Sequence, residues 1–324
     1  TRHLTNSGIP TQGIAFYHQS TLDLLQGLSC SVGLRYDYEH ARCDFSKVQQ
    51  PLNGNGETKS LEQFNRSLHF GQFTPRFSMQ YLSSHNQLFY ASVSKGYKAG
   101  GFNVSFLNND DYLYSPEYNW NYEIGTKLSF LNNRLSADLS LFYIDWRNQQ
   151  ITNTIPTVGN VIRNAGRSRN KGIEASFQAR PTKSWMMYMN YGYTDARFVH
   201  YQKEERGILK DYGGNYLPMV PRHTFSLTTG YSFYDICSWI DRLTLNAGVS
   251  VTGPIYWYED NQAKQNPYAL VNLRISINKG CFTWEVWSKN LTNTDYLSYY
   301  FVTSKAYAQK GKPITLGTSV SISL

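Results

Sequence analysis

The 324-residue chain contains no run of about 18 apolar residues, which excludes a membrane-spanning helix. It has only four cysteines, and none of them forms a CxxC pair, which argues against a zinc or dithiol redox site. It also lacks a block of lysine and arginine and any nucleic-acid-binding motif, so no nucleic-acid partner is predicted. The seven histidines are scattered, and no Ser/His/Asp or paired-carboxylate arrangement is recognisable, so the sequence predicts neither a metal site nor an enzyme.

The net charge is +8, and scattered surface and lumen charge explains it most simply. Attraction for anionic lipopolysaccharide or for an anionic ligand is the alternative. Cys237 and Cys281 fall in two short turns on the same side of the expected sheet, where free thiols are favoured over a disulfide. The chain starts at Thr1 without a signal peptide, and we expect it to be the C-terminal part of a longer, processed protein.

Aromatic residues and strict alternation are what the chain has in abundance. It contains 26 Tyr, 17 Phe and 7 Trp, more than a soluble core needs and typical of the aromatic belts of membrane proteins. In the last stretch, residues 314–324, Leu316, Thr318 and Val320 alternate with Gly317, Ser319 and Ser321. This period of two predicts a strand with one apolar face and one polar face.

The same period recurs along the whole chain. It predicts about thirteen strands, separated by connections that alternate strictly between short and long. Long connections are expected at 45–65, 98–115, 148–168, 196–218 and 293–310, with a further hairpin around Thr157–Gly159. The predicted strands are 12–19, 28–37, 75–82, 88–97, 121–130, 135–141, 173–178, 185–194, 225–233, 243–252, 269–278, 282–291 and 314–324.

This pattern favours an all-β, antiparallel transmembrane β-barrel segment. Short turns on one side and long loops on the other are typical of outer-membrane barrels. Aromatic residues gather at strand ends beside the short turns, as an interfacial girdle requires: Tyr81, Trp185, Tyr234, Trp239, Phe282 and Trp284. A soluble β-sandwich or propeller also alternates but seldom over so many long strands. Bacterial barrels have even strand numbers, so further strands are expected upstream.

Five motifs carry a family resemblance, in order along the chain. They are YASVSKGYKAGGFN at 90–103, NYEIGTK at 121–127, NAG and GIE at 164–166 and 172–174, VPRHTFSL at 220–227, and KNLTNTDY at 289–296. Together they make the chain resemble the TonB-dependent outer-membrane receptors. The tail from Val251 is most similar to the branch that contains ferric-yersiniabactin (pesticin) receptors. The terminal Leu324 departs from the Phe or Trp with which the family usually ends.

The resemblance implies a barrel of about 22 strands in the bacterial outer membrane, closed by an N-terminal plug domain. Residues 1–324 would then be a single domain that holds about the last thirteen strands, without the plug. It further implies cargo, usually a ferric siderophore, bound at the extracellular mouth, with no covalent cofactor. The TonB complex would supply energy through the plug, and outer-membrane lipid and lipopolysaccharide would surround the barrel.

Aromatic clusters at the ends of the long loops are the candidate ligand contacts, because aromatic rings offer large flat surfaces at low entropic cost. Loop packing or an extracellular girdle is the alternative role for these rings. Basic neighbours of the rings are expected to meet an anionic chelate. The candidates are Tyr97, Lys98, Tyr112, Tyr114, Tyr256, Trp257, Tyr258, Lys264, Tyr299, Tyr300, Phe301 and Lys305.

A second set of charged residues falls on the polar face of the predicted strands: Glu123, Lys127, Glu174, Arg222 and Arg274. A charge that faced lipid near the bilayer centre would cost about 2–4 kcal/mol, so we expect these residues to face the lumen or the plug. The glycines of Lys95–Gly101 are expected to permit a bulge or turn at the strand end.

The function expected from the sequence is active import of a scarce nutrient, most simply a ferric siderophore, by a transporter that is not an enzyme. The same class of receptor with haem, cobalamin or a glycan as cargo is the first alternative. A barrel enzyme or a passive porin is the second.

Overall fold

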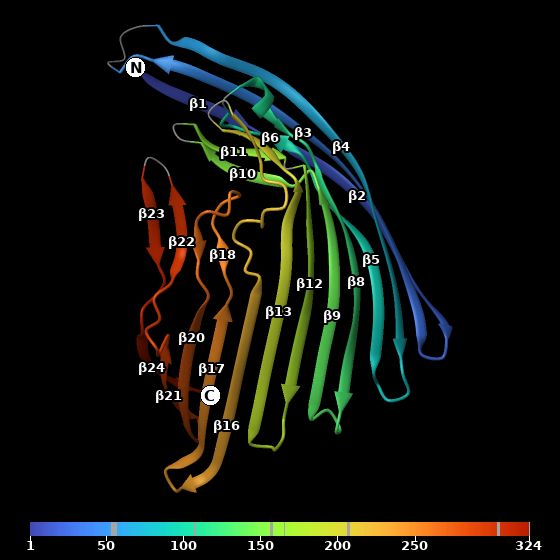
Figure 1. Ribbon diagram of the computed structural model, residues 1–324, viewed down its shortest axis with the longest axis vertical. Helices are drawn as coiled ribbons and strands as arrows, with labels where there is room; N and C mark the ends of the chain where they lie inside the picture. Colours follow the sequence, from blue (N-terminus) through green and yellow to red (C-terminus); the bar gives the residue numbers. More distant parts are fainter. Residues whose placement is uncertain are drawn as a thin grey trace.

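The computed structural model describes residues 1–52, 57–106, 108–155, 158–164, 166–205, 208–302 and 305–323. Most of these residues belong to one large antiparallel, curved sheet, with β1 and β2 at one edge and β24 at the other (Figure 1). Leu324, Thr157 and Ala165, which the sequence motifs included, lie outside the described residues. In the described part of the chain, no helix is long and apolar enough to cross a membrane.

The sheet contains fourteen strands, and from β2 onward each pairs with the next strand of the sheet in chain order. Both β1 and β2 pair with β3, along different parts of its length, so the sheet has thirteen strand positions, as the alternation predicted. The strands are β1 (Arg2–Gly8), β2 (Thr11–Leu25), β3 (Leu28–Gln50), β4 (Lys59–Leu82), β5 (Leu88–Lys98), β8 (Glu117–Phe130), β9 (Leu135–Arg147), β12 (Arg167–Ala179), β13 (Trp185–His200), β16 (His223–Cys237), β17 (Ile240–Thr252), β20 (Tyr268–Lys279), β21 (Phe282–Lys289) and β24 (Thr315–Ile322).

The strand register places apolar side chains in rows on one face of the sheet. Leu245 of β17 lies opposite Tyr231 of β16 and Ile275 of β20, and all three are exposed. The adjacent row on the other face contains Gly230, Asn246 and Arg274, because successive side chains point to opposite sides. We call the apolar side the outer face and the polar side the inner face. An exposed apolar outer face of this extent is what a hydrocarbon environment would cover.

The short turns all lie at one end of the sheet and the long connections at the other (Figure 1). This confirms the predicted alternation of connections. The expected loop at 45–65 is wrong, because β3 and β4 remain paired from Gln49 and Lys59 inward. Their extended ends have polar residues on one side and Cys43, Phe45 and Phe64 on the other, where a packed cluster forms instead of a loop.

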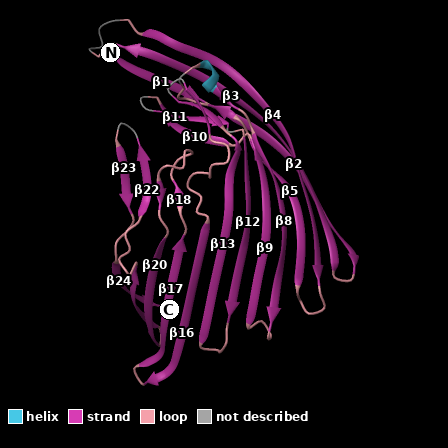
Figure 2. Ribbon diagram, in the orientation of Figure 1, coloured by secondary structure: helices cyan, strands magenta, loops and turns pink. Residues whose placement is uncertain are grey.

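The remaining long connections also contain short secondary-structure elements, of which the sequence pattern predicts one hairpin (Figure 2). A predicted hairpin within 148–168 is confirmed as β10 and β11. The short elements are β6 (Gly101–Phe102), the 3₁₀ helix η1 (Asn109–Tyr112), β7 (Leu113–Tyr114), β10 (Gln150–Ile155), β11 (Gly159–Asn164), β14 (Gln202–Glu205), β15 (Ile208–Asp211), β18 (Ile255–Tyr256), β19 (Lys264–Gln265), β22 (Leu297–Val302) and β23 (Ala306–Lys310).

The four cysteines are free thiols, as favoured for Cys237 and Cys281 from the sequence. The turns that carry these two residues are joined by Asp241. Its carboxylate accepts a hydrogen bond from Lys279 Nζ at 2.7 Å and one from the backbone N–H of Gly280 at 2.8 Å. These two hydrogen bonds hold the pKa of Asp241 below its usual value, and the bond from Lys279 has the larger effect.

Candidate ligand-binding site

A cavity of about 640 Å³ lies among the long connections. Five separate segments form it: the start of β10, the chain from the end of β13 to β14, residues 217–220, the chain after β18, and β22. Its volume falls in the range of small-molecule sites. Its lining is mostly apolar and aromatic, and includes Ile151, Phe198, Leu217, Val220, Trp257, Tyr258, Tyr299, Tyr300 and Phe301.

Aromatic contacts join the two sides of the cavity. The ring of Trp257 lies 6.4 Å from the ring of Tyr299 in an edge-on arrangement, and 6.4 Å from that of Tyr300. Tyr258 contacts Tyr300 edge-on at 6.2 Å. Such pairs are stabilising beyond the area they bury. They hold the β22–β23 hairpin against the segment that follows β18, although about forty residues separate them in sequence.

One backbone hydrogen bond fixes the same two segments. The N–H of Val302 donates to the hydroxyl of Tyr258 at 2.6 Å. Burial raises the pKa of Tyr258; the Val302 bond acts in the opposite direction without reversing the shift. The phenol therefore stays protonated at neutral pH, and its own hydrogen remains available as a donor.

The charged groups that border the cavity are paired. Lys203 Nζ lies 3.6 Å from a carboxylate oxygen of Glu259, and both side chains are largely buried. Two polar atoms of lining residues have no hydrogen-bond partner among the described residues: the indole N–H of Trp257 and the side-chain oxygen of Gln150. An unsatisfied buried polar group costs about 1–3 kcal/mol, and such a cost is a common mark of a site that meets a ligand or water.

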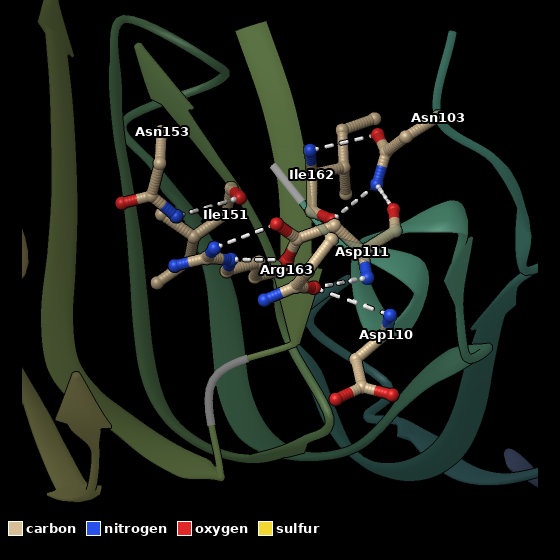
Figure 3. A network of polar contacts seen from close by, with 8 residues as sticks. Asn103, Asp110, Asp111, Ile151, Asn153, Ile162 and Arg163 are labelled. Atoms are coloured by element: carbon tan, nitrogen blue, oxygen red, sulfur yellow. Dashed lines mark hydrogen bonds and ion pairs between the residues drawn. The ribbon is translucent and has the colours of Figure 1, made fainter. Parts of the chain in front are cut away.

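The β10–β11 hairpin, which supplies Ile151 and Asn153 to the cavity wall, is held from its other side by a polar network (Figure 3). Arg163 donates to both carboxylate oxygens of Asp111 at 2.7 and 2.8 Å. The amide of Asn103 donates to the carbonyls of Asp111 and Ile162, both at 2.8 Å, and accepts from the N–H of Ile162. The hairpin is thereby fixed to the connection 99–116 by a bidentate ion pair and by the two hydrogen bonds between Asn103 and Ile162.

The base of the hairpin is anchored in the same way. Gln150 donates through its side-chain nitrogen to the carbonyl of Ala99 at 2.7 Å, and its backbone N–H donates to Glu117 at 2.5 Å. Val161 of β11 is fully buried. These contacts fix the position of the first residues of β10 at the cavity.

The structure brings five of the predicted ligand contacts to this cavity and separates the others. Trp257, Tyr258, Tyr299, Tyr300 and Phe301 line it together. The neighbouring Tyr256 instead stacks on Tyr216, with ring centroids 5.4 Å apart. Tyr112 is buried in another cluster, stacked on Phe64 and edge-on to Phe106, and Tyr114 pairs with Gly101 in the β6–β7 ladder.

The basic candidates do not line the cavity. Lys98 ends β5, where it pairs with Glu117 of β8 along the backbone. Lys264 pairs with Tyr256 in the β18–β19 ladder, and Lys305 is exposed between β22 and β23. Tyr97 is also outside the cavity, and its buried hydroxyl has no partner among the described residues. Lys203, which the sequence did not single out, is the cation that lines the cavity within the described part of the chain.

The charged candidates of the polar strand face occupy several environments. Glu123 accepts a hydrogen bond from Tyr90 at 2.6 Å, and Arg274 lies 3.8 Å from Glu285. Lys127 stands opposite Asp138 in the strand register, and Glu174 opposite Ser140. Arg222 lies just before β16, where its guanidinium packs over the ring of Tyr216 at 4.8 Å, beside Arg197, rather than on the strand itself.

Gln149, Gln150, Asn153, Lys203, Glu259 and Phe198 are cavity residues that sequence reasoning missed. They come from connections expected to be irregular, and no local pattern shows which side chains of such loops converge. The hairpin predicted near 157–159 was the one available signal, because a hairpin brings its two strand ends together at its base.

Comparison with known proteins places the chain in a family. The family model described as TonB dependent receptor-like, beta-barrel, matches residues 3–293. The pesticin receptor of Yersinia pestis is 24% identical over 99% of this chain and 45% of its own length. The probable TonB-dependent siderophore receptor PiuA of Acinetobacter baumannii is 26% identical over 69% of this chain and 30% of its own length.

The fold is similar to that of a solved receptor. The crystal structure of the ferric yersiniabactin uptake receptor FyuA from Yersinia pestis superposes with a TM-score of 0.82 and 21% identity, and covers 99% of this chain and 47% of that chain. The chain thus spans less than half the length of these relatives. The match over residues 3–293 and the antiparallel sheet with its alternating connections agree, and the chain belongs to the TonB-dependent receptor β-barrel family.

Proposed function

We propose that this chain is the barrel part of an outer-membrane receptor that binds and imports a ferric siderophore. The named relatives are siderophore or pesticin receptors, and the family consists of transporters and receptors rather than enzymes. In this proposal residues 1–324 form one domain, the C-terminal part of the barrel. The TonB complex acts through a plug domain, and the chelate is cargo rather than a resident cofactor.

The observation that carries the proposal is the aromatic cavity among the long connections. Trp257, Tyr299 and Tyr300 converge there from two segments, while an ion pair neutralises the charge of Lys203. A flat, chelating organic molecule fits such a lining better than a nutrient recognised by charge or by many hydroxyl groups. The inner-face charges Glu123, Lys127, Glu174 and Arg274 would then face the plug. A passive porin would need no such site.

Binding and uptake test the proposal together. We expect Trp257→Ala and Tyr299→Ala to weaken binding of a ferric siderophore to the purified receptor by about thirtyfold or more, as truncation of an aromatic side chain at the centre of a binding contact does. Tyr256→Ala is the matched control, because this neighbouring ring stacks on Tyr216 and lies outside the cavity. Uptake of the radioactive iron complex should require an active TonB system. Equal affinity of all three variants would contradict the assignment of the site.

The first alternative is the same import with haem, cobalamin or a glycan as cargo. A competition series separates these cargoes from ferric chelates, since only the true cargo displaces a bound fluorescent ligand at low concentration. An enzyme or a porin would act without TonB, and uptake that persists in a strain without TonB would favour one of these.

A further inference from the structure

Five cationic side chains gather on the outer face near the long-connection end of β9, β12 and β13. The register puts Lys171 opposite Tyr143 and Asp195, and Arg169 opposite Asp145 and Arg197. Residues that stand opposite each other, and those two apart along a strand, share a face. The face is the outer one, because it continues as Ile173 and Leu141. The five residues, called here the cationic patch, are Arg147, Arg167, Arg169, Lys171 and Arg197.

The basic side chains of the patch are exposed, whereas the carboxylates beneath them are buried. Arg147 and Arg167 both bind Asp145, at 3.2 and 2.6 Å, and their side chains are 49% and 38% exposed while that of Asp145 is 10% exposed. Lys171 is likewise 54% exposed over Asp195, which is 11% exposed. Five cations less two carboxylates leave a net charge of +3. Arg169 is exposed and makes no hydrogen bond or ion pair within the described part of the chain.

The position of the patch relative to the exposed tyrosines indicates which kind of molecule it meets. On the outer face it begins at the row of Tyr122 and Tyr143, whose rings lie 6.3 Å apart, and extends away from the short turns. Exposed tyrosines on such a face lie at the level of lipid headgroups. Cations just beyond them meet the phosphates of anionic lipids, and guanidinium groups bind phosphate oxygens in pairs. Exposed apolar residues on the same strands would contact the acyl chains.

We propose that the cationic patch is a binding site for the phosphorylated headgroup of an outer-leaflet glycolipid of the lipopolysaccharide type. Asp145 and Asp195 position the basic groups of the patch through ion pairs, and their own carboxylates are nearly buried. The inference rests on the membrane placement in the proposed function but does not depend on the cargo.

The full receptor chain, incorporated into phosphatidylcholine nanodiscs with a minor fraction of bisphosphorylated lipid A, provides the test. Lipid retained after delipidation is measured by mass spectrometry, with dephosphorylated lipid A and inorganic phosphate as separate probes. Wild type should retain the phosphorylated lipid in a salt-sensitive manner. The variant Arg147→Gln/Arg167→Gln/Arg169→Gln should bind it roughly a hundredfold more weakly, since each basic residue near an anionic lipid surface contributes about fivefold.

The variant Arg134→Gln/Arg180→Gln/Lys183→Gln is the matched control, because it removes three exposed cations at the short turns and should leave lipid retention unchanged. If the patch variant fails to fold, Arg169→Gln alone should weaken retention by about fivefold. Equal retention by wild type and Arg169→Gln would overturn the proposal. Equal binding of dephosphorylated lipid, or inorganic phosphate binding as tightly as the lipid, would also overturn it. Loss of uptake with lipid retained would concern only the proposed function.

Discussion

The backbone N–H of Val302 donates a hydrogen bond to the hydroxyl of Tyr258 across the aromatic cavity. The bond joins the β22–β23 hairpin to the segment after β18, so it controls how far one wall of the cavity stands from the other. Tyr258→Phe keeps the ring and removes the acceptor. We expect it to cost about 1 kcal/mol of hairpin docking, measured as faster amide exchange at Val302. Tyr256→Phe should leave that exchange rate unchanged.

Leu245 lies on the outer face between Tyr231 and Ile275, whereas its neighbour Thr244 lies on the inner face. Leu245→Lys would place a charge toward hydrocarbon at a cost of about 2–4 kcal/mol, and we expect poor assembly. Thr244→Lys should assemble like wild type. The measurement is heat-modifiable migration of the outer-membrane fraction on gels. Equal assembly of the two variants would reverse the assignment of the two faces.

The ion pair between Arg163 and Asp111 fixes the β10–β11 hairpin to the connection 99–116. Because Asp111 is buried, Asp111→Asn leaves Arg163 without its full partner, and local opening of the hairpin should become easier by about 3 kcal/mol. Hydrogen exchange over Gln150–Asn164 measures it. Asp110→Asn changes the exposed neighbour, and protection of the hairpin should then stay as in wild type.

The Asp241 carboxylate joins two short turns through Lys279 and Gly280, and these hydrogen bonds lower its pKa. A lowered pKa in the folded state means that the stabilisation is fully present above the unfolded value of about 4, and that it is lost as pH falls through the folded pKa. The Gly280 amide should therefore be protected from exchange at neutral pH and lose protection in acid below about pH 4. In Asp241→Asn, that change with pH should disappear.

The sequence predicted the strands well because alternation is a local signal. On β17, for example, Leu245 and Thr244 follow the outer and inner faces that the period of two assigns. The pattern fails at the long-connection end of the sheet. The ends of β3 and β4 have polar residues on one side, and their apolar partners Phe45 and Phe64 pack against Phe106 and Tyr112 of another connection. A contact of that kind depends on distant residues.

The candidate site was predicted by residue type and only in part by position. Aromatic enrichment pointed to Trp257 and Tyr299, and the structure brings them together. It could not show that Tyr112 belongs to a different cluster, because several of the long connections are rich in aromatic residues. The sequence analysis also predicted that Lys264 would contact an anionic ligand. The folded loops instead place Lys203 and its partner Glu259 at the cavity.

The β10–β11 hairpin touches two places at once. Ile151 and Asn153 form part of the cavity wall, and Arg163 on the opposite strand forms an ion pair with Asp111 in the connection 99–116. A ligand that prefers the hairpin position in which Arg163 and Asp111 are paired would stabilise that ion pair. By reciprocity, loss of the ion pair would then weaken ligand binding by the same free energy.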